Sequence, residues 1–296
     1  MKDVSKNIQG ISVVITTHDR YAYLLEAIQS VVKQSLKPTQ IIVVDDGTPV
    51  PIERQFKKDG FVLDEIELTV IRIDDKGPSA ARNAGFKGCS GDLIAFLDDD
   101  DLWDFNYLEK CVSFLQGENA DCVVTWLTCF NGKERWPGKK FPENYQSLDL
   151  YDKNHGFIGS NFIIRRNCYQ LMSGFDELLL GSEDKDFLIR MVAQNISIAV
   201  MPEPLVLYRI HPKSQASGKS NFHFMQVYGK YEFYKKHSIN MPRITRWRLK
   251  SQSSYFLFRG ARQKSERLKG FLDFVLSIPL ALLAILINKK NRKHSL

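Results

Sequence analysis

The stretch Leu93–Asp101, LIAFLDDDD, joins an apolar run of strand length directly to four consecutive carboxylates. Three earlier segments have the same form. In each of them polar residues directly follow a β-branched run, namely Ile11–Ile15, Ile41–Val44 and Leu68–Ile73. Strands that are apolar on both faces and alternate with helical patterns are typical of a mostly parallel sheet covered by helices. The sequence therefore predicts an α/β fold in which the polar ends of these strands meet at one edge.

Helical patterns lie between these strands. In Tyr21–Lys33 the apolar residues fall on one helical face. Pro78 near a first turn and Gly88 after a last turn predict a second helix over Ser79–Lys87. Ligands of open α/β sheets bind outside the carboxyl ends of the strands. Because several carboxylates at one edge repel one another, a divalent cation among them is one expected solution.

Length and composition limit the class of protein. The 296 residues are 44% hydrophobic and 25% charged, which allows one large α/β domain or a domain with an appendage. Wholesale disorder, collagen-like repeats and a polytopic membrane protein are not expected. The five cysteines contain no C-x-x-C pair, and the N-terminus has no apolar signal region. These features predict a reducing, cytoplasmic compartment.

The net charge of +7 is unevenly distributed. Residues 241–296 hold 13 lysines and arginines against two acidic residues, so an acidic body carries a basic tail. Within the tail, the apolar run Phe274–Ile287 is 14 residues long, or about 21 Å of helix, against the roughly 30 Å of a membrane core. A helix packed on the main domain, an interfacial or re-entrant anchor beside anionic lipid, and a true membrane span all remain open. A basic charge can also indicate nucleic-acid binding, but the apolar run within the tail does not fit that function.

The acidic motif Phe96–Trp103, FLDDDDLW, is the first candidate site. Carboxylates at a strand end can divide their work between a metal ion and a hydroxyl group. Oxygen ligands with incomplete protein coordination suit Mg²⁺ or Mn²⁺ completed by substrate phosphates. A solvated acidic turn is the alternative, and the spacing excludes an EF-hand.

Three further motifs contain groups that suit phosphate or proton chemistry. Gly77–Gly85, GPSAARNAG, opens a helix with a glycine and includes Arg82, which suits a diphosphate. Gly181–Phe187, GSEDKDF, opens a helix with acids that are either dipole partners or a general base. Tyr208–Ser217, YRIHPKSQAS, combines Arg209 with a histidine after a strand.

Taken in order, the motifs ISVVITTHDR, VVDDG, GPSAARNAG, GDLIAFLDDDDLW, GFDELLLGSEDKDFLIRM and YRIHPKS resemble the family 2 glycosyltransferases of the GT-A fold. The resemblance covers about residues 11–217. It implies a Rossmann-like nucleotide-binding half over about residues 11–105 and an acceptor half over about residues 106–220, both within a domain of residues 1–220. Residues 221–296 then form a basic, helical C-terminal tail.

The resemblance also implies the site residues. Six positions match residues that contact the donor nucleotide: Thr16, His18, Arg20, Asp46, Arg82 and Asp98. Among these, Asp46 matches the acid that reads the base and Asp98 the acid on the ribose side. Asp100 and His211 match the metal side, and whether Asp99 shares the role of Asp100 is left open. Asp184 matches the catalytic base, and Glu183 is its supporting neighbour.

The implied activity is transfer of a hexosyl or N-acetylhexosaminyl group from a nucleotide-diphosphate donor, commonly a UDP-sugar, to a hydroxyl group with inversion. The implied cofactor is Mn²⁺ or Mg²⁺. The acceptor would be a glycan or a lipid-linked molecule of polysaccharide or lipopolysaccharide synthesis, with no nucleic-acid partner. The expected location is cytoplasmic, with attachment to the cytoplasmic face of the membrane left open.

Two alternatives from other classes remain. One is a catalytically silent, sugar-nucleotide-binding scaffold subunit, against which the joint presence of Asp98, Asp100, Asp184 and His211 counts. The other is a nucleotidyltransferase, which would need an early glycine-rich phosphate loop that Thr16–Arg20 lacks.

Overall fold

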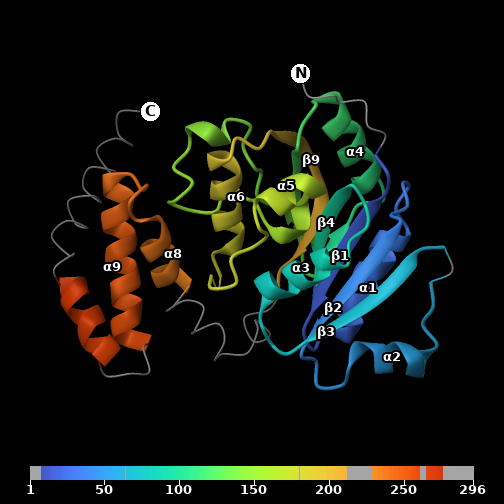
Figure 1. The fold of residues 1–296 in the computed structure, drawn as a ribbon, viewed down its shortest axis with the longest axis horizontal. Coiled ribbons are helices and arrows are strands. Elements are labelled where there is room, and N and C mark those ends of the chain that lie inside the picture. Colours follow the sequence, from blue (N-terminus) through green and yellow to red (C-terminus); the bar gives the residue numbers. More distant parts are fainter. Residues whose placement is uncertain (1–7, 64, 180, 212–228, 261–264, 276–296) are drawn as a thin grey trace. The chain divides into compact units, whose positions relative to one another are not determined.

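The computed structural model describes residues 8–63, 65–179, 181–211, 229–260 and 265–275 (Figure 1). The chain forms two compact units that interleave in sequence. The sheet unit takes its residues from Met1–Leu148, His155–Glu177 and Phe187–His211. The helical unit takes its residues from Asp149–Asn154, Leu178–Asp186 and Pro212–Leu296.

The first four strands of the sheet unit form the predicted parallel sheet. In spatial order they are β3 (Glu67–Ile73), β2 (Gln40–Asp46), β1 (Ile11–Thr17) and β4 (Leu93–Asp98). Thr16 lies opposite Val44 on one side and Asp98 on the other. The carboxyl ends of β1, β2 and β4 are therefore aligned at one edge, as the sequence predicts, and the α/β fold class is confirmed.

The second half of the sheet is mixed. Antiparallel pairing of β8 with β4 joins the halves, and β6 then lies antiparallel to β8 and parallel to β9. Short strands extend this half, with β5 pairing with β9 and β7 pairing with β6. The bounds are β5 (Leu102–Trp103), β6 (Cys122–Phe130), β7 (Arg135–Pro137), β8 (Phe162–Arg165) and β9 (Ile198–Arg209). Within the described residues, nine strands form one sheet.

Helices occupy the connections between the strands. In chain order they are α1 (Tyr21–Val32), α2 (Ile52–Asp59), α3 (Pro78–Lys87), α4 (Tyr107–Gly117), α5 (Arg166–Leu171), α6 (Glu183–Ala193), α8 (Lys230–His237) and α9 (Arg243–Gly260). The short 3₁₀ helices are η1 (Tyr145–Ser147) and η2 (Gly159–Asn161), and residues 265–275 are also helical. The helices predicted over Tyr21–Lys33 and Ser79–Lys87 are confirmed as α1 and α3.

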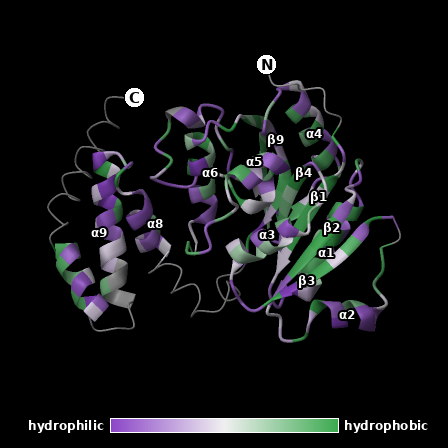
Figure 2. Ribbon diagram, viewed as in Figure 1, coloured by the Kyte–Doolittle hydropathy of each residue, from purple (hydrophilic) through white to green (hydrophobic). Residues whose placement is uncertain are grey.

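The core of the sheet unit forms because β1, β2 and β4 consist mostly of buried hydrophobic residues (Figure 2). On one face, α1 and α4 belong to the same buried cluster as Val13 and Ile15 of β1. On the other face, α3 crosses the strands closely. A Cβ atom at Gly85 would lie 2.3 Å from Cγ1 of Val14, so only glycine allows this approach. This close packing fixes the start of α3 at the carboxyl edge of the sheet.

Asp45 organises the loop that follows β2. Its side chain is buried and accepts hydrogen bonds from the amides of Thr48 (2.9 Å) and Ile52 (3.1 Å) and from Nη1 of Arg72 (2.5 Å). Burial alone would raise the pKa of Asp45, but the hydrogen bonds from Thr48, Ile52 and Arg72 outweigh it and lower the pKa. The ionised carboxylate therefore stabilises this loop.

We expect Asp45→Asn to lower the free energy of unfolding near neutral pH by about 1.5–3 kcal/mol, the usual contribution of hydrogen bonds to a charged group. The lowered pKa means that the unfolded chain binds more protons than the folded chain in acid, so wild-type stability falls as the pH drops through both pKa values. The difference between wild type and variant should therefore shrink below about pH 4. Urea unfolding near neutral pH and below about pH 4 measures this difference in stability. Asp74→Asn, at an exposed residue, is the control. A pH-independent difference would contradict it.

Candidate active site

A buried arginine, Arg82, forms an ion pair with the partly exposed Asp98 at the carboxyl edge. Nη2 of Arg82 lies 2.7 Å from Oδ1 of Asp98, and only 3% of the Arg82 side chain is exposed. Its guanidinium group also lies 5.1 Å from the ring centre of Phe175. Gly159 of η2 makes room for this arginine, because a Cβ atom there would lie 2.5 Å from Nη2. The N-terminal half of α3 thus presents a cation next to the end of β4.

Asp100 and His211 form a second pair, at a sequence separation of 111 residues. Nε2 of His211 lies 2.7 Å from Oδ2 of Asp100, and both side chains keep a small exposed fraction. Nη1 of Arg20 lies 2.6 Å from the same carboxylate oxygen. Burial alone would lower the pKa of Arg20, but Asp99 and Asp100 outweigh it and raise the pKa. The structure therefore brings together three residues that the sequence motifs place far apart.

The other two carboxylates of the tetrad are buried. Asp99 accepts a hydrogen bond from Oγ1 of Thr17 (2.7 Å), and burial with the nearby Asp100 charge raises its pKa to about 7. Asp101 accepts hydrogen bonds from Oγ of Ser160 (2.6 Å) and from the amide of Arg209 (3.0 Å), and burial raises its pKa. The tetrad thus alternates, with Asp98 and Asp100 partly exposed and Asp99 and Asp101 buried.

The residues at the ends of β1 and β2 also lie at this edge. Nδ1 of His18 is 2.5 Å from the backbone oxygen of Asp46. The Asp46 carboxylate accepts hydrogen bonds from the amides of Lys76 and Gly77, both at 2.7 Å. Asp46 therefore holds the turn that precedes α3. The motifs do not reveal this role, because a contact across 31 residues leaves no local pattern.

Arg209, which the motif Tyr208–Ser217 includes without a defined role, is a further residue of the site. Its Nε donates to the backbone oxygen of Asp100 (2.7 Å), and its Nη2 lies 2.6 Å from Oε2 of Glu26. The guanidinium group lies over the rings of Tyr23 and Phe130, at 4.5 and 4.4 Å. Arg209 therefore orients the backbone of the acidic turn. Its position two residues before His211 is the one sequence signal for this.

Asp100 and His211 are the described residues that best suit a divalent cation. No group of three or more histidine, cysteine, aspartate or glutamate side chains in the described ranges could hold a metal ion. One carboxylate oxygen and one imidazole nitrogen nevertheless suit Mn²⁺ or Mg²⁺ that receives its remaining ligands from phosphate and water. The donor set fits such a partly coordinated ion.

Glu183 and Asp184 lie in the first turn of α6 and belong to the helical unit. Glu183 is 8% exposed and Asp184 is half-buried. Acids in a first turn are favoured by the helix dipole, and one with access to solvent can also accept a proton. Asp184 fits this second use better, since it is the less buried of the two.

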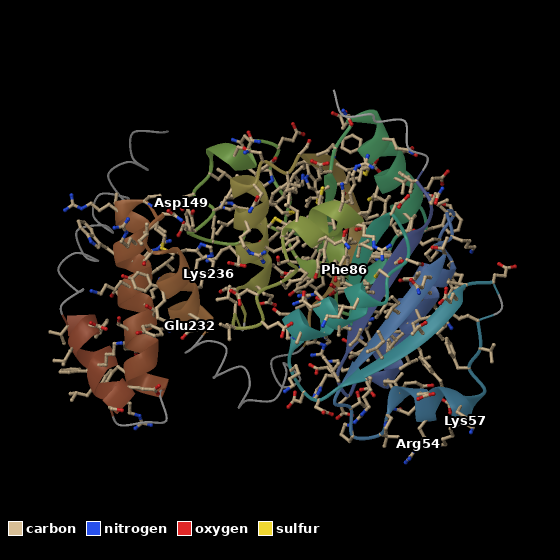
Figure 3. All side chains as sticks on the ribbon, in the orientation of Figure 1. Arg54, Lys57, Phe86, Asp149, Glu232 and Lys236 are labelled. Carbon is tan, nitrogen blue, oxygen red and sulfur yellow. The ribbon has the colours of Figure 1, made fainter. Side chains whose placement is uncertain are left out.

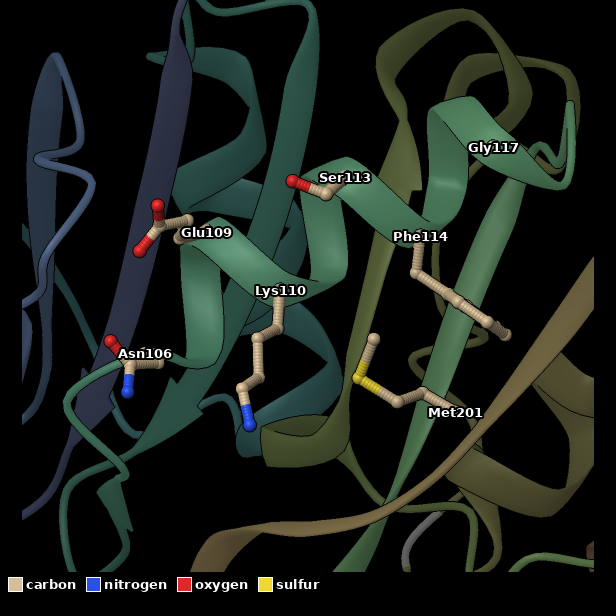
Figure 4. A pocket seen from close by; sticks show the side chains of 7 residues that line it. All are labelled: Asn106, Glu109, Lys110, Ser113, Phe114, Gly117 and Met201. Carbon is tan, nitrogen blue, oxygen red and sulfur yellow. The ribbon is translucent and has the colours of Figure 1, made fainter.

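A separate pocket of about 650 Å³ lies along α4 (Figure 4). It is lined by Asn106, Glu109, Lys110, Ser113, Phe114, Gly117 and Met201. Lys110 is already paired with Glu203 at 2.5 Å. None of the residues that the sequence motifs single out lines this pocket, so it is distinct from the carboxyl edge of the sheet.

The parallel strands, the acidic end of β4 and the arginine at the start of α3 define a glycosyltransferase of the GT-A type. The family model described as glycosyl transferase family 2 matches residues 12–171, and the model of glycosyl transferase family group 2 matches residues 93–287. The chain belongs to the family 2 glycosyltransferases, which confirms the resemblance drawn from its motifs.

Relatives of known sequence agree with this assignment. The uncharacterized glycosyltransferase YwdF of Bacillus subtilis is 29% identical over 67% of this chain and 73% of its own length. The minor teichoic acid biosynthesis protein GgaA of the same organism is 28% identical, over 67% of this chain but 46% of GgaA. The pre-mycofactocin glycosyltransferase of Mycobacterium tuberculosis is 28% identical over 59% of this chain, and the match spans 38% of that protein.

Solved structures share the fold. TarS of S. aureus, residues 1–349, in complex with UDP-GlcNAc superimposes with a TM-score of 0.63 at 19% identity, covering 92% of this chain and 82% of TarS. The mannosyltransferase PcManGT of Pyrobaculum calidifontis, in complex with GDP-Man and Mn²⁺, gives a TM-score of 0.55 at 16% identity, over 97% of this chain and 77% of PcManGT. These likenesses confirm the GT-A fold.

Proposed function

We propose that this glycosyltransferase is inverting and moves a hexosyl or N-acetylhexosaminyl group from a UDP-sugar to a hydroxyl group. One observation carries the proposal. Asp98 and Asp100, which are alternate residues at the carboxyl end of β4, pair with Arg82 and His211 respectively. An arginine for diphosphate and ligands for a cation are the groups that a nucleotide-diphosphate leaving group needs. Thr16, His18, Arg20 and Asp46 lie at the adjoining strand ends and would contact the nucleotide.

Asp100 and His211 would hold a Mn²⁺ or Mg²⁺ ion, which when bound supplies positive charge for the departing diphosphate. Arg82 binds the diphosphate and neutralises part of its charge. Asp184 takes the proton from the acceptor hydroxyl as that oxygen attacks the anomeric carbon. The displacement occurs in one step from the opposite face, so the anomeric centre inverts and the enzyme needs no nucleophile of its own.

A panel of UDP-, GDP- and dTDP-sugars tests the donor class. We expect a UDP-sugar with Mn²⁺ to raise the thermal midpoint by several degrees, since a ligand at about 100 times its Kd stabilises by about 2.7 kcal/mol. If only GDP- or dTDP-sugars raise the thermal midpoint, the donor is not a UDP-sugar. Stabilisation without release of the nucleotide would instead support a silent donor-binding subunit, and no response to any donor would refute the proposal.

Gly159→Ala tests the role of Arg82 without altering it. A methyl group at residue 159 would collide with Nε, Cζ and Nη2 of Arg82 and displace the guanidinium group from Asp98. We expect the affinity for the UDP-sugar to fall about 10- to 100-fold, the usual loss of charge-assisted hydrogen bonds. Calorimetric titration measures this. Gly117→Ala is the matched control, because nothing lies within 4 Å of its added methyl group. Equal affinities of both variants would argue against Arg82 as a diphosphate ligand.

The acceptor is proposed to be a glycan or lipid-linked molecule of cell-surface polysaccharide synthesis at the cytoplasmic face of the membrane. The naming of GgaA as a teichoic acid biosynthesis protein supports this acceptor class. None of the described helices is long and apolar enough to cross a membrane. Most of the apolar run Phe274–Ile287 lies outside the described residues, which end at residue 275.

The described end of the tail nevertheless supports contact with lipid. In the helix of residues 265–275, Leu268, Leu272 and Val275 form a stripe with exposed fractions of 60, 53 and 45%. Arg267 and Lys269 beside the stripe are exposed cations. An apolar stripe flanked by basic residues suits an anionic membrane surface. We propose that this stripe lies on the membrane.

Sedimentation with vesicles containing phosphatidylglycerol tests this contact. We expect the wild-type protein to pellet with these vesicles, less so at high salt, and the double variant Leu268→Glu/Leu272→Glu to remain in the supernatant. Leu171→Glu in α5 is the matched control, because Leu171 is 61% exposed, as Leu268 is at 60%. Pelleting of the double variant at the wild-type level would exclude the stripe as the contact.

A further inference from the structure

The helical unit surrounds the two residues that follow Asp184. Asp186 is fully buried in the first turn of α6. Its Oδ1 lies 2.7 Å from Nε2 of His237 and 2.8 Å from Nζ of Lys236. Both partners are at the C-terminal end of α8, where Figure 3 labels Lys236. A carboxylate and two basic groups therefore join α6 to α8.

Lys185 makes a second connection to the same helix. Its Nζ lies 3.8 Å from the ring centre of Phe233 in α8 and donates a hydrogen bond to the backbone oxygen of Tyr151 at 3.2 Å. Burial lowers the pKa of Lys185 to about 8. The segment around Tyr151 is itself held by α9, through Thr245 to Asp149 and Arg248 to Asp152. Contacts from α8 and α9 thus converge on the residues after Asp184.

Helix geometry explains why these contacts matter for Asp184. Successive side chains of an α-helix are rotated by about 100°. Asp184 and Asp186 therefore project from nearly opposite faces of the helix. Fixing Lys185 and Asp186 therefore sets the rotation of the first turn from which Asp184 projects. A buried carboxylate held by two basic groups resists displacement, because losing a partner leaves an uncompensated charge.

We propose that α8 is a positioning element for the catalytic base: the contact of His237 and Lys236 with Asp186 orients the first turn of α6, and with it Asp184. The inference rests on the proposed role of Asp184. His237 is a positioning residue and does not touch substrate. The donor-binding residues belong to the sheet unit, so loss of this contact should affect the turnover step and leave donor binding unchanged.

The test uses the full-length protein, Mn²⁺ and the UDP-sugar that stabilises it most, with water as the acceptor and nucleotide release as the readout. We expect His237→Ala to lower kcat about 10- to 100-fold with an unchanged donor KM, since misplacement of a catalytic group by about 1 Å can have that effect. His237→Gln keeps an N–H donor toward Asp186 and should restore most of the kcat. Lys235→Ala is the matched control, because Lys235 is 49% exposed and pairs with Glu232 at 2.7 Å.

Three results would overturn the inference: wild-type kcat in His237→Ala, equal loss in His237→Gln and His237→Ala, or a donor KM that rises in proportion to the loss of kcat. If His237→Ala does not fold, Lys236→Met removes the second basic group from Asp186 at a side chain that is 32% exposed. Wild-type kcat in that variant would likewise overturn it. Asp184→Asn, measured in parallel, separates the two proposals. Loss of turnover there together with normal kcat in His237→Ala would reject the positioning role alone.

Discussion

Asp184→Asn is expected to lower the rate of nucleotide release from the UDP-sugar by about 10²- to 10⁴-fold, the usual contribution of a general base. The amide has nearly the shape of the carboxylate but cannot accept a proton at neutral pH. Donor affinity should not change, because the proposed donor contacts at the carboxyl edge, such as Arg82 and Asp98, are retained. Single-turnover release measures the rate, and calorimetry measures the affinity.

Asp121→Asn provides the control for this change. Asp121 is an acid whose Oδ2 accepts a hydrogen bond from the amide of Ser197, and it precedes β6 at the end opposite to the strand terminus Phe130. We expect it to leave nucleotide release unchanged. Near-normal nucleotide release by Asp184→Asn would show that Asp184 is not the general base. Loss of donor affinity in that variant would instead assign Asp184 to donor binding.

Asp100→Ala is expected to abolish the effect of Mn²⁺ on donor binding. Loss of this carboxylate leaves His211 as a single ligand, so metal affinity should fall at least about 10-fold. The Kd of the UDP-sugar measured with Mn²⁺ should then approach the value measured with EDTA. Arg20 also loses a partner at 2.6 Å. Comparison with and without metal separates that loss from the metal effect, since the loss of the Arg20 contact is present in both titrations.

Asp92→Ala is the matched control for the metal prediction. Asp92 immediately precedes β4, at the other end of the strand from Asp98, and its Oδ2 accepts a hydrogen bond from the amide of Gln9. It should keep the wild-type response to Mn²⁺. A wild-type response to Mn²⁺ in Asp100→Ala would instead mean that other residues bind the cation. The buried Asp99 would then be the next residue to substitute.

Much of the fold was predictable because its signals are local. The apolar runs of β1 to β4 and the polar residues after them predict parallel strands whose carboxyl ends meet at one edge, and both features are observed. The start of α3 was equally predictable from Pro78 and its glycine-rich surroundings. Periodicity could not predict the mixed second half of the sheet, where β6 pairs with β8 and β9 across long separations.

The candidate site divides in the same way. Its acidic tetrad is plain in the sequence, but the sequence does not say which carboxylates are buried. Asp99 and Asp101 become buried because Thr17 and Ser160 approach them from distant parts of the chain. Hydrogen bonding to these hydroxyl groups leaves Asp98 and Asp100 as the accessible pair.

The α/β class, the carboxyl edge and the residue types at that edge follow from the order of residues alone, because hydrophobic periodicity and strand ends are properties of neighbouring residues. Which distant groups meet depends on the folded arrangement. Gly159 makes room for Arg82 across 77 positions, and His237 reaches Asp186 across 51. Such contacts depend on how helices and strands pack, which leaves no periodic trace in the chain.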